Sequence, residues 1–247
     1  TTYIYNSSGS SIKGRTDNAI EIDSAGDVNI YNSSGALIQG ASDGVFGGVN
    51  SNYSGAGISI HSAGAVSINN SGGADIKSSD ANGDAIHLGG NDSVYISNSG
   101  AGSEIWGRDT AIYVHDTTGS GVSIYNSGGA SITGHSGAGI DVQSAGRVFI
   151  RNGSGSTIAG YGVDVDTIGG YGHGIEVDAI RSGGVTINNA GTITSDYHGI
   201  HIYDVSGETN INNYSAGSIF GSANAVKITN DSGGTVFINN SGEIKTS

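Results

Sequence analysis

Carboxylate, histidine and tyrosine side chains recur at one position of a repeated segment, and these residue types are the best suited to chemistry. Asp141 and Glu176 stand at equivalent positions of two successive repeats. If the repeats stack as parallel strands, the two carboxyl groups lie roughly 5 Å apart, near the separation found in retaining glycosidases. They are the best catalytic candidates in the chain, although any acidic stack of strands brings carboxylates this close on a solvated face.

Alignment of the repeats produces two columns of such residues. The first column, which contains both carboxylates, holds Glu21, Ser59, His87, Tyr113, Asp141, Glu176, His201 and Lys227. The second column, two residues further along each repeat, holds Asp23, His61, Gly89, His115, Gln143, Asp178, Tyr203 and Thr229. We expect both columns to point outward and to form a polar face that meets solvent. The side chains predicted to bind a ligand on this face are His87, Tyr113, His115, Asp178 and His201.

These columns do not favour an enzyme, and glycoside hydrolase or polysaccharide lyase activity is the alternative interpretation. Lyases of this shape use a basic residue to stabilise an enolate, and neither column places Lys or Arg beside Asp141 or Glu176. The histidines form no His-x-x-x-His pair and the chain has no cysteine, so we predict no metal site and no cofactor. Calcium is compatible with the acidic charge, but no motif indicates it.

The elements that position these residues follow from a repeat of V-x-I-x-N segments. Nine isoleucines mark the repeat: Ile4, Ile30, Ile68, Ile96, Ile124, Ile150, Ile187, Ile211 and Ile238. Successive markers are 24 to 28 residues apart, except for two steps of 38 and 37 residues. A period of this length is typical of a solenoid, in which each unit stacks on the next.

Each repeat contains three short apolar pieces that alternate with polar residues, which is the pattern of half-buried strands. We therefore predict an all-β fold, a single-stranded parallel β-helix of about nine coils with three short strands each. One domain spans residues 1–247, with loop insertions near 41–57 and 161–174. The loops carry four aromatic side chains as candidate contacts with a partner: Phe46, Tyr53, Tyr161 and Tyr171.

An asparagine stands two residues after every marker isoleucine. The nine positions are Asn6, Asn32, Asn70, Asn98, Asn126, Asn152, Asn189, Asn213 and Asn240. Asparagine tolerates left-handed backbone at a bend, and its amide both donates and accepts hydrogen bonds. We predict an internal asparagine ladder at one corner of the coil.

The composition limits the kinds of partner that the chain can bind and the environments in which it can work. The 22 acidic and 9 basic residues give a net charge of −13, which argues against nucleic acid as a partner. The apolar runs are too short to insert into a membrane. The chain begins Thr-Thr without Met, so we expect it to be a processed product or an excised segment, and the first fits export. The absence of cysteine agrees with an extracellular location.

The repeat units resemble those in the passenger regions of bacterial autotransporters and related large adhesin-like surface proteins. The resemblance rests on "VSINNSGGADIKSS", "VSIYNSGGASITG", "VTINNAGTITS" and "VFINNSGEIKTS", with "GAGISIHSAG" and "GAGIDVQSAG" between such units. It implies a right-handed coil at the bacterial cell surface. It also implies an adhesive or self-associating role, since only some of these passengers are enzymes.

The two ends of the repeat suggest how the chain assembles. No cap is visible beside Tyr3 and Ile4 or beside Ile238 and Ile244. Either the chain is a fragment of a longer rod, or its first and last coils stack on other copies, and we favour the second interpretation. The favoured function is an extracellular structural or adhesive protein that forms a surface fibre or matrix filament by head-to-tail stacking. Glycans and host or cell surfaces are further expected partners. The alternative is a polysaccharide-binding or polysaccharide-degrading β-helix that uses the outward face of the third strand.

Overall fold

The computed structural model describes every residue except 25, 42–54, 63, 118, 120, 145, 163–171, 179–182, 204, 230–232 and 247. Within the described residues, the regular elements are all β-strands. No helix in this part of the chain is long and apolar enough to cross a membrane. The predicted all-β class is therefore confirmed.

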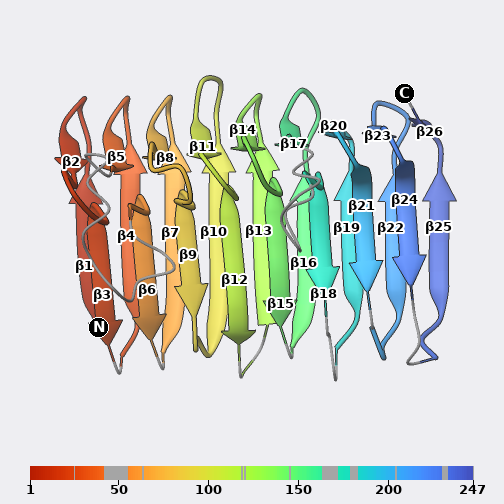
Figure 1. Ribbon diagram of the computed structural model, residues 1–247, viewed down its shortest axis with the longest axis horizontal. Coiled ribbons are helices and arrows are strands. Elements are labelled where there is room, and N and C mark those ends of the chain that lie inside the picture. Colours follow the sequence, from red (N-terminus) through yellow and green to blue (C-terminus); the bar gives the residue numbers. More distant parts are fainter. Residues whose placement is uncertain are drawn as a thin grey trace.

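Parallel strands form three sheets that run the length of the molecule (Figure 1). The first sheet contains β1 (Thr2–Asn6), β4 (Val28–Ser33), β7 (Ala65–Ser71), β10 (Ser93–Ser99), β13 (Gly121–Ser127), β16 (Arg147–Asn152), β19 (Val185–Asn189), β22 (Thr209–Asn213) and β25 (Val236–Asn240). The second contains β2 (Ser11–Lys13), β5 (Leu37–Gly40), β8 (Asp75–Ser78), β11 (Glu104–Gly107), β14 (Ser131–Gly134), β17 (Thr157–Gly160), β20 (Thr192–Ser195), β23 (Ser218–Gly221) and β26 (Glu243–Thr246). The third contains β3 (Ile20–Ser24), β6 (Ile58–Ser62), β9 (Ile86–Gly89), β12 (Ile112–Thr117), β15 (Ile140–Ser144), β18 (Ile175–Asp178), β21 (His198–Tyr203) and β24 (Asn224–Thr229).

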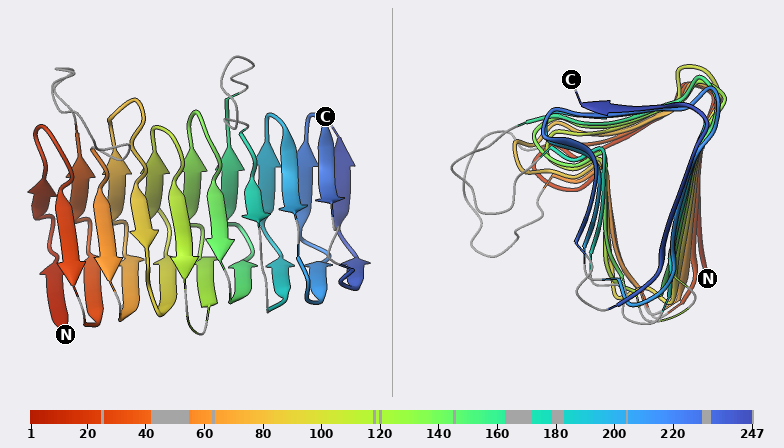
Figure 2. Two further views of the ribbon diagram at one scale, coloured as in Figure 1. Left: turned by 60° about the horizontal axis from the view of Figure 1, so that its bottom comes forward. Right: turned by 90° about the vertical axis from the view of Figure 1, so that its right-hand side faces the viewer.

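Each coil contributes one strand to each sheet, and the sheets form the three sides of a triangle when the rod is viewed along its axis (Figure 2). The turns between the second and third sheets project sideways from the triangle and form a row along the rod (Figure 2). Both long insertions of the sequence fall in this row, and residues 42–54 and 163–171 within them lie outside the described part. The row stands beside the polar face of the third sheet.

The core is a set of aliphatic columns that run along the rod axis. The marker isoleucines pair in register from strand to strand, for example Ile68 with Ile96 and Ile96 with Ile124. All three side chains are fully buried. Burial of each such side chain contributes about 1.5–3 kcal/mol, so the repeated Ile and Val positions explain why this sequence stacks in one register.

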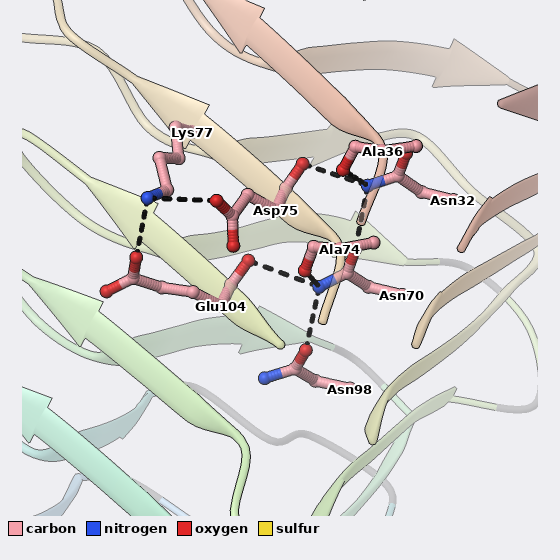
Figure 3. Close-up of polar contacts among 8 residues, drawn as sticks. All are labelled: Asn32, Ala36, Asn70, Ala74, Asp75, Lys77, Asn98 and Glu104. Atoms are coloured by element: carbon pink, nitrogen blue, oxygen red, sulfur yellow. Dashed lines mark hydrogen bonds and ion pairs between the residues drawn. The ribbon is translucent and has the colours of Figure 1, made fainter. Parts of the chain in front are cut away.

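The predicted asparagine ladder is present, and Figure 3 shows part of it. Asn70 Nδ2 donates to Asn98 Oδ1 over 2.9 Å, and the same nitrogen donates to the backbone carbonyls of Ala74 and Glu104. Each side-chain amide from Asn6 to Asn213 donates to the asparagine of the next coil, and Asn240 accepts the last of these hydrogen bonds. The ladder satisfies polar groups at a buried corner and links every coil to its neighbours.

One detail of the ladder differs from the sequence interpretation. We expected the asparagines to hold the left-handed backbone at the bend, but they lie within or at the ends of strands. The left-handed φ angles fall two and three residues later, at Ser8 (58°) and Gly9 (72°) and again at Ser34 (56°) and Gly35 (71°). The amide geometry of the ladder needs extended backbone, so the turn that follows takes the positive φ angles, where glycine is favoured.

Candidate functional site

The corner where each sideways turn enters the third sheet holds several buried titratable side chains. Each strand of the third sheet has two aliphatic residues that point into the core, such as Ile86 and Leu88 in β9, and we call them the inward pair. Two positions of each repeat lie at the corner. One is two residues before the inward pair, and the other lies between its two members. The first position holds Asn18, Ala56, Asp84, Thr110, Ala138, His173, His198 and Asn224. The second is the first polar column of the sequence, from Glu21 to Lys227. We call these two columns the corner row.

The strand registers confirm both polar columns predicted from the sequence. In the first, His87 pairs with Tyr113, Tyr113 with Asp141, Asp141 with Glu176, and Glu176 with His201. In the second, Gln143 pairs with Asp178, and His115 pairs with Gln143. The alternation of the third strand therefore places these residues one coil apart, as the repeat spacing predicts.

The expectation of a uniformly solvated face is wrong at several of these positions. His87 has no exposed surface and Ser59 is buried. The imidazole of His87 is surrounded by the rings of His61, Tyr113 and His115, whose centroids lie 5.8, 5.0 and 5.1 Å away. Large side chains stacked one coil apart cover one another, which the alternation of a single strand does not reveal.

An Asp-His-His chain of contacts lies at the centre of this aromatic group. His87 Nδ1 lies 2.9 Å from Asp84 Oδ2, and His87 Nε2 lies 3.2 Å from His115 Nε2. The other carboxyl oxygen of Asp84 accepts a hydrogen bond from the backbone N–H of Thr110. Both ring nitrogens of His87 are thus engaged, so the imidazole is held in one orientation.

Burial controls the charges of this chain. Burial, together with smaller contributions from the neighbouring His115 and His61, lowers the pKa of His87 to about 3. Burial also raises the pKa of the Asp84 carboxyl well above its usual range, with Asp109 adding to the effect. His87 is therefore uncharged at neutral pH, and its contact with Asp84 is a hydrogen bond rather than an ion pair.

A second group of side chains forms further along the corner row, where two successive coils read His-Gly-Ile-Glu and His-Gly-Ile-His. We call this group the histidine cluster, and its members are His173, Glu176, His198 and His201. Glu176 Oε2 lies 3.7 Å from His173 Nε2, and Glu176 Oε1 lies 3.3 Å from His201 Nδ1. One ligand atom from each of His173, Glu176 and His201 lies within 4.8 Å of the other two.

The third imidazole of the cluster belongs to His198. Its ring centroid lies 5.2 Å from those of both His173 and His201, and the centroids of His173 and His201 are 4.9 Å apart. Burial lowers the pKa values of His173 and His198 to about 4, so both imidazoles are neutral at pH 7. Both ring nitrogens of His198 and of His201 are buried without a hydrogen-bond partner among the described residues.

Glycine at one position of the turn permits this packing. A Cβ atom at Gly174 would lie 2.5 Å from the carbonyl oxygen of Gly199 and 2.8 Å from Ile193 Cγ2. The backbone N–H of Gly174 donates to the carbonyl oxygen of His198 in the next coil. The close approach of the two backbones stacks His173 over His198 and Glu176 over His201.

The carboxyl pair proposed from the sequence is also brought together. Asp141 and Glu176 are partners in the register of β15 and β18. Burial raises the pKa of Asp141 well above its usual range, and the carboxylate of Glu176 raises it further. Asp141 Oδ1 is buried and has no hydrogen-bond partner within the described residues. Glu176 itself is shared with two imidazoles, which spacing along the sequence did not indicate.

The remaining predicted contact residues do not form one further site. Tyr161, at the start of the second insertion, is 38% exposed. Tyr113 is half-buried, and its hydroxyl donates to Gln143 Oε1 over 3.4 Å. Asp178 is half-buried next to the histidine cluster. The other three loop aromatics, Phe46, Tyr53 and Tyr171, lie outside the described residues.

Sequence reasoning missed three important side chains, namely Asp84, His173 and His198. They lie in or beside the turn, where period-two alternation does not predict side-chain direction. The sequence did contain one signal for these side chains. Asp84, His173 and His198 each stand two residues before the inward pair of their repeat and three residues before a member of the first column. A third aligned column would have grouped them with His87, Glu176 and His201.

Comparison with known proteins adds no relative. A scan of protein-family models, a search of curated proteins and a search of solved structures each gave no match to this chain. The resemblance to autotransporter passenger repeats therefore stays a prediction from the sequence.

Proposed function

We propose that this chain is a non-enzymatic structural and adhesive rod that acts outside a bacterial cell, where it extends into a fibre or matrix filament by coil-on-coil stacking with copies of itself. The observation that carries this proposal is the unbroken stack, in which the asparagine ladder and the aliphatic columns continue in register from one terminal coil to the other. A stack of this kind resists bending because every coil is hydrogen-bonded to both neighbours.

The terminal coils offer the pairing surface that inner coils use. Ile211 in β22 has no exposed surface, whereas the equivalent Ile238 in β25 is 48% exposed. Tyr3 is exposed and Ile4 is half-buried in β1, and Ile244 is half-buried in β26. A further coil would bury these side chains and pair the open backbone edges, and for the 247-residue chain we propose that a second copy supplies it.

Electron microscopy of the purified 247-residue chain over a range of concentrations, with and without calcium, tests the proposal. Filaments with an axial repeat near 40 Å are expected, since eight steps of about 4.8 Å separate the first and last coils. Ile238→Lys should abolish them, because a charge at the pairing surface opposes burial. Tyr214→Lys is the matched control, since it changes an exposed side chain on the side of the rod. Dispersed rods of the unaltered chain at every concentration would contradict the proposal.

A polysaccharide ligand is the second candidate, and the register of Asp141 with Glu176 favours it. Carboxyl groups one coil apart match the spacing of a retaining glycosidase, and the exposed tyrosines of the first sheet, including Tyr5 stacked on Tyr31 at 5.0 Å, offer flat surfaces for sugar rings. Asp141→Asn and Glu176→Gln should each abolish cleavage of a susceptible glycan. Cleavage that persists in both variants would exclude these carboxyls as catalysts.

A further inference from the structure

We propose that the histidine cluster is a binding site for a divalent transition-metal ion and that Zn²⁺ fits it best. The proposal rests on the placement of three imidazoles and one carboxylate from two adjacent coils. It is independent of the structural and adhesive function, whereas a metal ion held by Glu176 would withdraw the carboxyl group that glycan cleavage requires.

The spacing of the rings matches shared coordination. Zn²⁺ binds imidazole nitrogen at about 2.0–2.1 Å, so three imidazoles on one tetrahedral ion place their ring centroids about 5 Å apart. The three separations in the cluster are 4.9, 5.2 and 5.2 Å. Glu176, whose two oxygens lie 3.3 and 3.7 Å from ring nitrogens of His201 and His173, supplies the fourth ligand. One ligand atom from each of His173, Glu176 and His201 already lies within 4.8 Å of the other two. His198 lies outside that group, and its ring, whose centroid is 5.2 Å from those of His173 and His201, must rotate to bring a nitrogen to the same ion.

The buried nitrogens of the cluster also favour a metal ion. His198 is 2% exposed, yet neither of its ring nitrogens makes a hydrogen bond to a described residue. The side chain of His201 is 14% exposed, its Nδ1 lies 3.3 Å from Glu176 Oε1, and its Nε2 has no hydrogen-bond partner among the described residues. A buried polar group without a partner costs about 1–3 kcal/mol. Coordination would satisfy one nitrogen of each ring. The Asp84–His87 pair occupies the same two positions of another coil, and its imidazole uses both nitrogens in contacts with neighbours, so it serves as an internal contrast.

The chemistry of the ligands selects the ion. Three imidazole nitrogens and one carboxylate oxygen suit Zn²⁺ and other borderline divalent ions, whereas Ca²⁺ and Mg²⁺ prefer sites made of oxygen. Asp141, the register partner of Glu176, adds a carboxyl group beside the site. A metal ion here would link the coil of β18 to the coil of β21, and so would clamp the rod directly after its second insertion.

Isothermal titration of the untagged, chelator-treated 247-residue chain with ZnCl₂ tests the proposal, and Co²⁺ absorption reports the geometry. One tight site and the intense visible bands of tetrahedral Co²⁺ are expected. His201→Ala and Glu176→Gln should each weaken Zn²⁺ binding by at least about 100-fold, since even the loss of a group that only orients a ligand costs about 10–100-fold. Both residues retain some exposure, so the metal-free variants are expected to keep the wild-type circular dichroism.

His115→Ala is the matched control, because it removes a histidine from the separate aromatic group around His87. It should leave Zn²⁺ affinity unchanged, and Zn²⁺ should raise the melting temperature of this variant and of the wild type but not that of His201→Ala. Zn²⁺ affinity that is equal in wild type, His201→Ala and Glu176→Gln would overturn the proposal. Loss of binding in His115→Ala alone would overturn it as well.

Discussion

The rod buries polar side chains along two of its edges, and the two edges are built in opposite ways. At the asparagine corner, one residue type repeats in every coil and each amide donates to the next coil. In the corner row beside the third sheet, residue types change from coil to coil and several buried nitrogens have no partner among the described residues. The uniform column satisfies its own hydrogen bonds and holds the coils together, whereas the varied columns leave buried polar atoms open, which is why we propose a ligand there.

The largest loss of stability is expected when the asparagine ladder is interrupted. Asn98→Ala removes the donor to Asn126 Oδ1 and to the carbonyl oxygen of Ser131. Two buried acceptors lose their partner, so the free energy of unfolding should fall by roughly 2–5 kcal/mol in urea titrations. Asn212→Ala is the control, because Asn212 donates to Asn188 in a half-buried pair outside the core. Equal losses of unfolding free energy in the two variants would show that the buried ladder stabilises the rod no more than the half-buried pair does.

The second prediction concerns how the stability of the rod depends on pH through the buried His87 of the corner row. The pKa of His87 is about 3 in the folded chain, below the usual value of 6.5. The unfolded chain therefore binds a proton first as pH falls, and stability declines between about pH 6.5 and pH 3 by at most about 1.4 kcal/mol per unit. The surrounding groups are Asp84, His61, Tyr113 and His115. Asp84, whose pKa is raised, contributes in the opposite direction as pH falls.

Comparison of variants isolates the contribution of His87. His87→Gln should lose less stability than the wild type between pH 7 and pH 4, as measured by urea unfolding at each pH. His135→Gln, at an exposed turn, is the control and should follow the wild-type profile. A His87→Gln profile that coincides with the wild-type profile would refute the assignment of a buried neutral imidazole.

A smaller effect is expected from the backbone that supports the histidine cluster. Gly174→Ala forces a Cβ atom against the carbonyl oxygen of Gly199, and the neighbouring coil must shift. Overpacking of this kind costs about 1–3 kcal/mol, and the displaced His173 should also weaken Zn²⁺ binding. Thermal unfolding and zinc titration measure the two consequences. Unchanged values of both would mean that the close approach of these coils does not position the cluster.

The smallest effect is expected at the solvent-facing margin of the corner row. The Tyr113 hydroxyl donates to Gln143 over 3.4 Å in an exposed contact. Tyr113→Phe keeps the ring that packs on His87 and should change the free energy of unfolding by less than about 0.5 kcal/mol. A loss of several kcal/mol would place this hydroxyl within the network rather than at its margin.

The sequence predicts the uniform parts of the rod well and the varied parts poorly. Ile96 and Asn98 belong to columns in which every coil carries an aliphatic or an asparagine residue, so alignment alone reveals strand, register and ladder. The register of the first polar column also follows from the sequence, because each of its residues stands between two members of the aliphatic columns. Burial of His87 and the approach of His198 to His201 depend on the turn and on side chains from other coils. Those contacts are set by three-dimensional packing, which period-two alternation does not encode.

Anomalous diffraction at the zinc absorption edge, from crystals of the 247-residue chain grown with Zn²⁺, tests the contrast between the two edges most directly. The account predicts a strong peak among His173, Glu176, His198 and His201, with no peak along the asparagine ladder. An empty histidine cluster with saturating Zn²⁺, or a principal peak at another position, would contradict it.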